Sequence, residues 1–181
     1  FKEYVKSKGP IFIKLLQIFL INSYKYGDEF SEEEINKLNE ILDKVHYEKE
    51  NADFDVGCGS VAYVYFDKED RNKVIKKVLP DIENEIESST KQFKNMCYMA
   101  NMVMNLPYDE KGIDDYKEIL LKQTKLDKEA ENMIRMKKTI VFNNVIIPKV
   151  YEYNENMIKM EYVEGIKLSE FIYKYPDKKE E

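Results

Sequence analysis

The chain has 181 residues, of which 43% are hydrophobic and 35% are charged, so it is long and apolar enough to bury a core. Its net charge is −6, which argues against a nucleic-acid partner because nucleic-acid surfaces need concentrated basic residues. The single histidine rules out a His-rich metal site, and no metal ligands are predicted. Cys58 and Cys97 lie far apart, so we expect reduced thiols and a reducing intracellular compartment.

The N-terminal part of the chain is predicted to be helical. Gly9 is a turn signal, Pro10 suits the first position of a helix, and residues 11–24 are apolar nearly all round. The apolar run 11–21 is shorter than the roughly 20 residues that span a bilayer. Two uses of this run stay open, namely packing against the rest of the lobe or contact with a membrane surface or lipid. A capping box and apolar residues at helical spacing predict a second helix over residues 31–45.

After residue 51 the pattern of apolar residues predicts a small sheet with helices packed on it. The predicted strands are residues 61–66, 73–79, 145–153 and 157–162. The predicted helices are residues 81–105, one long helix over 113–139 and a short helix over 168–173. Strands that surround a long helix in this order indicate the α+β class.

Glycines cluster where a phosphate-binding loop would need them. The segment VGCGSVAYV, residues 56–64, matches G-x-G-x-x-A-x-V, and glycine lets a backbone turn sharply and approach an anion. In a dinucleotide-binding fold this motif leads into a helix, whereas here it leads into a predicted strand, as in kinases. An ordinary hairpin turn is the alternative for the motif taken alone. The candidate nucleotide-binding residues of this loop are Gly57, Gly59, Ser60, Ala62 and Val64.

A lysine on the following strand is the candidate phosphate ligand. A kinase needs one lysine that points at the α and β phosphates. Lys76 stands at the better position in the segment VIKKV, and Lys77 is the fallback. Such a lysine needs a carboxylate partner on a helix, for which Glu129 is the candidate. Taken one at a time, both residues could equally be exposed surface charges.

The segment IKMEYVEG, residues 158–165, is similar to a kinase hinge, in which a strand passes into a short extended link. Met160 would lie at the back of the pocket, and the backbone from Glu161 to Val163 would meet the adenine edge. The four motifs follow one another in the order glycine loop, strand lysine, helix glutamate and hinge. That order is harder to obtain by chance than any one motif.

These segments together resemble the UbiB-type atypical kinases, also called aarF-domain-containing kinases. The segment GPIFIKLLQ, residues 9–17, resembles the opening motif G-P-x-F-I-K-x-G-Q of that family. The segment EAEN, residues 129–132, resembles its E-A-x-N motif, in which the glutamate pairs with the strand lysine. Residues 147–151 and 160–165 resemble its P-x-V-Y and M-E-Y-x-x-G segments.

The chain departs from the family pattern at several positions. Leu16 replaces a glycine of the opening motif, and glycines stand in a loop that is usually alanine-rich in the family. Gln123 and Lys125 replace the two acids of an E-x-D motif, which are thought to pair with the opening lysine and cover the active site. Lys14 would lose both partners and be repelled by Lys125, so we expect this covering arrangement to change.

The resemblance implies a helical extension over residues 1–50, a nucleotide-binding small lobe over 51–165, and the start of a further helix with a charged tail over 166–181. It implies ATP or ADP as the ligand and a parent protein linked to quinone or lipid metabolism near a membrane. We expect no catalytic residues after Gly165, because a kinase large lobe supplies the catalytic-loop and Mg²⁺-binding residues. We therefore expect no phosphoryl transfer by this chain alone, and Mg²⁺ only together with a large lobe.

Two other classes of protein stay open. The chain could be a non-catalytic, pseudokinase-like module that docks a large lobe, another partner protein or a membrane. It could instead be a helical protein without a nucleotide role, in which case residues 57–62 would be helical.

Overall fold

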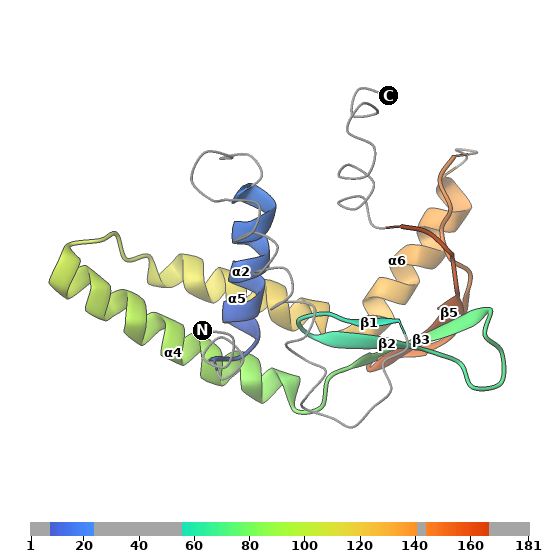
Figure 1. Ribbon diagram of the computed structural model, residues 1–181, viewed down its shortest axis with the longest axis horizontal. Helices are drawn as coiled ribbons and strands as arrows, with labels where there is room; N and C mark the ends of the chain where they lie inside the picture. Colours follow the sequence, from blue (N-terminus) through green and yellow to red (C-terminus); the bar gives the residue numbers. More distant parts are fainter. Residues whose placement is uncertain (1–7, 24–55, 141–143, 167–181) are drawn as a thin grey trace.

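The computed structural model describes residues 8–23, 56–140 and 144–166, and within them five antiparallel strands form one sheet beside the helices (Figure 1). The strand order across the sheet is β1-β2-β3-β5-β4. The strands are β1 (Gly57–Cys58), β2 (Ala62–Phe66), β3 (Lys73–Val78), β4 (Val150–Asn154) and β5 (Met157–Glu161). The helices are α2 (Pro10–Ser23), α4 (Ile82–Met104), α5 (Glu110–Gln123) and α6 (Leu126–Thr139). The predicted α+β class is therefore confirmed.

One face of the sheet is covered by α6. Leu126 and Ala130 of this helix are fully buried and form an apolar cluster with Ile158 of β5. The ends of the helix are stabilised by Asp127 and Glu129 in the first turn and by Lys137 and Lys138 in the last, which complement the helix dipole. The small cluster thus fixes α6 against the centre of the sheet.

A second apolar cluster joins the N-terminal helix to the long α4–α5 pair, which extends away from the sheet in Figure 1. Ile11 of α2 packs with Ile86 of α4 and Leu120 of α5, and all three are fully buried. Gly9 permits this close approach, because its φ is +84° and a Cβ there would lie 3.0 Å from the Cβ of Ser89. The apolar run of α2 therefore packs against the lobe at its first residues.

No helix in the described ranges has both the length and the apolar character needed to cross a bilayer. The expected helices over residues 31–45 and 168–173 lie outside the described residues.

The single long helix predicted over residues 113–139 is wrong, because two helices, α5 and α6, meet there. Thr124 folds back on α5, with its hydroxyl donating to the carbonyl of Leu121 at 2.8 Å. The N–H of Leu126 donates instead to the carbonyl of Glu155 in the β4–β5 turn, at 2.8 Å. Since that N–H is used by the sheet, the first helix cannot continue and a new one begins.

The predicted hairpin is present, but its first strand begins at Val150 and not at residue 145. Pro148 explains the late start, because proline has no N–H to donate to a neighbouring strand. The carbonyl of Ile147 is bound by a side chain instead, the ammonium of Lys137 at 3.0 Å.

Candidate functional site

The predicted phosphate loop is a β-hairpin. Gly57 pairs with Val64 across β1 and β2, and the N–H of Gly59 donates to the carbonyl of Ala62 at 2.7 Å. A Cβ on Gly59 would lie 3.3 Å from that same carbonyl oxygen, which explains a glycine at this turn. Ser60 is buried at the turn. Residues 57–62 are not helical, so the interpretation as a purely helical protein is wrong.

The strand lysine and the helix glutamate meet. The ammonium of Lys76 lies 2.7 Å from both carboxylate oxygens of Glu129, which reaches it from the first turn of α6. The side chains are 25% and 40% exposed, so the pair lies at the edge of the lobe interior and not in its core. Lys77 is exposed and points to the other side of the strand. Of the two candidates, Lys76 is therefore the one that reaches Glu129.

Several predicted site residues share the sheet face on which α6 lies. Val64, Lys76 and Ile158 lie side by side on β2, β3 and β5, and Ile158 contacts α6. Because side chains alternate along a strand, Ala62 and Met160 lie on this face too. The structure thus brings an apolar surface and one ammonium group together on one side of the sheet.

The hinge segment begins at Glu161, whose side chain is already engaged. Its carboxylate accepts the N–H of Lys149 at 3.0 Å and lies 3.7 Å from the ammonium of Lys137. Its own N–H donates to the carbonyl of Lys149 at 2.8 Å. The carboxylate of Glu161 therefore fixes the edge of the sheet.

The next residue, Tyr162, ties the hinge segment to the β2–β3 turn. Its N–H donates to the carbonyl of Asn72 at 2.8 Å, and its ring meets Phe66 edge-on with 4.8 Å between ring centres. Val163 follows and is 39% exposed. The hinge segment thus leaves the sheet from a fixed point.

Lys125 has partners that the sequence analysis missed. Its ammonium lies 3.1 Å from Glu83 at the start of α4 and 2.6 Å from Glu155 in the β4–β5 turn. Hydrogen bonds from Lys125 to Glu155 and then Glu83 hold its pKa above the usual range of a lysine. The predicted repulsion of Lys14 left out these two carboxylates, which neutralise the charge of Lys125. No local sequence pattern predicts these two contacts, because Glu83 and Glu155 lie about 30 to 40 residues away from Lys125 in the chain.

A further ion pair lies on the opposite face of the sheet. Asp67, at the end of β2, is buried and receives a bond from Lys159 of β5. The bond from Lys159, together with the N–H of Glu69 at 3.1 Å, lowers the pKa of the Asp67 carboxyl below its usual range. The pair therefore favours the ionised carboxylate in the folded state.

Replacing Asp67 by Asn should flatten the acid side of the stability profile. A carboxyl with a lowered folded pKa stabilises the fold above its unfolded pKa, near 4, and loses this contribution as pH falls through the folded value. Urea unfolding between pH 7 and pH 3 should therefore show a smaller acid-induced loss in Asp67→Asn than in the parent. Asp115→Asn, on the exposed side of α5, is the control. Parallel profiles for Asp67→Asn and the parent would contradict the assignment.

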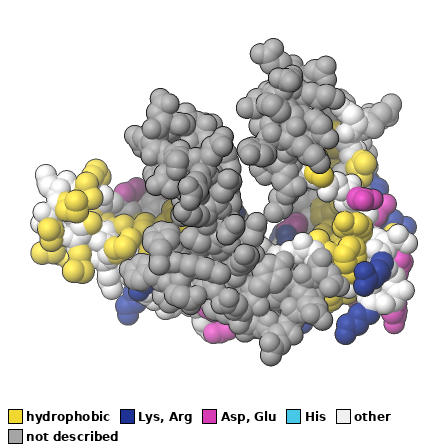
Figure 2. All heavy atoms as spheres, in the orientation of Figure 1, with side chains coloured by type: hydrophobic (Ala, Val, Ile, Leu, Met, Phe, Trp, Pro, Cys, Tyr) yellow, Lys and Arg dark blue, Asp and Glu magenta, His cyan; other side chains and the backbone are white. Residues whose placement is uncertain are grey.

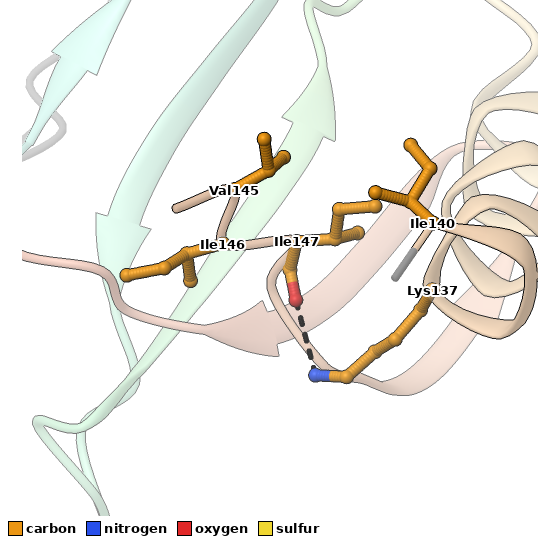
Figure 3. A pocket seen from close by; sticks show the side chains of 5 residues that line it. All are labelled: Lys137, Ile140, Val145, Ile146 and Ile147. Carbon is orange, nitrogen blue, oxygen red and sulfur yellow. Dashed lines mark hydrogen bonds between the residues drawn. The ribbon is translucent and has the colours of Figure 1, made fainter. Parts of the chain in front are cut away.

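A hollow of about 250 Å³ lies at the other end of α6 (Figure 3). Its walls are mostly apolar, and the one lysine among them, Lys137, donates to the carbonyl of Ile147. The residues that line it are Lys137, Ile140, Val145, Ile146 and Ile147. Since Glu129 lies in the first turn of α6 and this hollow lies at the last, the hollow is separate from the Lys76–Glu129 pair.

Among the described side chains, no group of His, Cys, Asp and Glu could hold a metal ion.

A comparison with protein families finds that residues 28–179 match the model of the ABC1 atypical kinase-like domain. The matched range includes the glycine hairpin, the Lys76–Glu129 pair and the hinge segment. No curated protein sequence matches the chain significantly.

Proposed function

Because the chain belongs to the ABC1 atypical kinase-like family, we propose that its small lobe binds an adenine nucleotide, ATP or ADP. The family and the kinase-like small-lobe fold are both those predicted from the sequence. A closer relation to the UbiB type, and a parent protein that works in quinone or lipid metabolism, belong to the proposal.

The Lys76–Glu129 pair is the observation that carries this proposal. An ammonium group has three N–H donors, and the two oxygens of Glu129 can engage two of them. One donor remains for a phosphate oxygen, while the carboxylate keeps the lysine in place. A lysine that served only the fold would gain little here, since a partly exposed ion pair contributes about 0–1 kcal/mol.

The neighbouring residues supply the other parts of such a site. The β1–β2 hairpin, with Gly57 and Gly59, would cover the phosphates through its backbone. Val64 and Met160, on the same sheet face as Lys76, would line the adenine ring. The backbone from Glu161 to Val163 would meet the polar edge of the adenine.

A second candidate function is a non-catalytic, pseudokinase-like module that binds a protein or a membrane. The observation in its favour is Lys125, which stands where the resembled kinases carry an acid. It ties α4 to the β4–β5 turn through Glu83 and Glu155. In this chain the position serves the fold and offers no acid to the site.

Thermal unfolding with and without nucleotide tests the first candidate. A ligand that binds only the folded chain stabilises it by RT ln(1 + [L]/Kd), which is about 2.7 kcal/mol at a hundredfold excess over Kd. ATP or ADP should raise the Tm of the parent chain and of Lys77→Ala, and leave the Tm of Lys76→Ala unchanged. No shift of the parent at millimolar nucleotide would overturn the proposal and favour the second candidate.

The 181-residue chain by itself is expected to bind nucleotide without turning it over. Incubation with ATP and Mg²⁺, followed by measurement of ADP, should give the same rate for the parent and for Lys76→Ala. A higher rate in the parent would contradict this expectation and would assign a catalytic group to the chain.

A further inference from the structure

The far end of the α4–α5 pair carries a large exposed apolar surface. Residues 95–108 contain no charged side chain, although 35% of the whole chain is charged. Four of the eight methionines of the chain lie within this segment. The exposed apolar residues here are Met96, Met99, Met102, Val103, Met104 and Leu106. We call residues 95–108 the apolar tip; the hydrophobic cluster at the left edge of Figure 2 marks this end of the pair.

The apolar tip is exposed on more than one side. Met102, Val103 and Met104 are consecutive helical residues, so their side chains point in directions about 100° apart. They are 69%, 82% and 67% exposed, respectively. A protein groove covers one face of a helix, whereas a lipid interface surrounds a projecting end. The distribution of the exposed residues therefore favours a lipid surface over a groove.

Two polar groups at the helix end of the tip are neutral and already bonded. The N–H of Asn105 donates to the carbonyl of Asn101 at 2.9 Å, and the side-chain amide of Asn101 donates to the carbonyl of Leu106 at 2.6 Å. These bonds end the helix without a charged cap, and the groups that they join keep a partner on entering an apolar phase. Tyr98 and Tyr108 meet edge-on at the base of the tip, and tyrosine favours the boundary between water and lipid.

Charges reappear just behind the tip, and the lysine that lies nearest to it on α4 is paired. Lys94 of α4 lies 3.0 Å from Glu110 and 2.7 Å from Asp114 of α5, which closes the base of the helix pair. Asp109 accepts the N–H of Gly112 at the start of α5. Because the lysine is already held by two acids, it offers little attraction to anionic lipid. Entry would depend on apolar contact and would stop at this ring of charges.

We propose that the apolar tip inserts into the interfacial layer of a lipid bilayer and that it needs no anionic lipid to do so. The helical part from Met96 to Met104 is about 12 Å long, far short of the roughly 30 Å of a bilayer core, so the tip can enter the interfacial layer without spanning the membrane. Ile11 and Ile13, in the run that the sequence offered for membrane contact, are buried. This inference does not depend on the proposed nucleotide site.

Flotation of the full chain with phosphatidylcholine vesicles tests the proposal. Val103→Glu should lower the bound fraction about tenfold, because it places a carboxylate on the most exposed side chain of the tip. Ile146→Glu is the matched control, since Ile146 is 72% exposed and lies in the segment between α6 and β4. Figure 1 shows α6 at the opposite end of the molecule from the far end of the α4–α5 pair. Ile146→Glu should float as the parent does. The double variant Met99→Ser, Met102→Ser gives a second test without a new charge.

Hydrogen exchange adds a test that needs no substitution, because vesicles should slow exchange in residues 95–108 more than elsewhere. Melting curves of the variants in the absence of lipid that equal the curve of the parent would show that the variants fold. Any Tm shift that nucleotide causes in the parent should also be present in Val103→Glu. Four results would overturn the proposal: no flotation of the parent, flotation only with anionic vesicles, equal flotation of Val103→Glu, or self-association in lipid-free solution that Val103→Glu abolishes. The last result would make the tip an interface between copies of the chain.

Discussion

Leu126→Ala is expected to lower the free energy of unfolding by about 2–5 kcal/mol, the usual cost of removing a large buried side chain. Leu126 is fully buried where α6 begins and packs with Ala130 and Ile158. The cluster that joins α6 to the sheet has these three fully buried members among the described residues, and Val78, Val150 and Met160 pack against it.

Urea unfolding of the parent and the variant measures this loss, with Ile119→Ala as the matched control. Ile119 lies on α5 and is 51% exposed, so its truncation should change stability by no more than about 0.5 kcal/mol. The same contact positions Glu129, one turn further along α6, against Lys76. A loss below about 1 kcal/mol in Leu126→Ala would mean that other contacts hold α6 in place.

The sequence was sufficient for the parts of the fold that depend on local pattern and on motif order. Strands β2 and β3 follow from alternation and from the polar turn between them, and α4 follows from its spacing. The meeting of Lys76 and Glu129 across 53 residues could be predicted only because both belong to known motifs. Their spacing alone contains no information about this contact.

The break between α5 and α6 was missed because its causes are distant in the chain. Residues 123–126 contain neither glycine nor proline, and periodicity continues across them. The break results from the β4–β5 turn, whose carbonyl at Glu155 takes the N–H of Leu126 and whose carboxylate binds Lys125. One local signal existed, since Asp127 and Glu129 form an acidic first turn that suits a helix start.

The partners of Lys125 could not be foreseen for the same reason. Glu83 and Glu155 come from two separate elements, and each resembles an ordinary surface acid in sequence. The comparison with known motifs considered only the acids that Gln123 and Lys125 replace and the effect on Lys14, and it did not ask what Lys125 itself contacts. A charge change at a motif position therefore has to be judged against every element packed around it.

Exchanging the charges of the Lys76–Glu129 pair should separate its role in the fold from its proposed role in binding. In the double variant Lys76→Glu, Glu129→Lys, the two side chains can still attract each other. Stability should therefore stay within about 1 kcal/mol of the parent, including the small cost of a lysine in the first turn of α6. Nucleotide affinity should fall on the order of 100-fold or more, because a carboxylate would then face the phosphates.

Urea unfolding and the Tm shift with ATP, measured on the same samples, give the two readouts. The exchange Lys128→Glu, Glu131→Lys is the matched control, because these residues form an ion pair of 3.1 Å on the exposed side of α6. It should leave both readouts unchanged. A double exchange at positions 76 and 129 that kept the full Tm shift would place the phosphates elsewhere on the lobe. Loss of the shift with stability retained would mean that the sign of the charge on β3, and not the pairing itself, decides what the site binds.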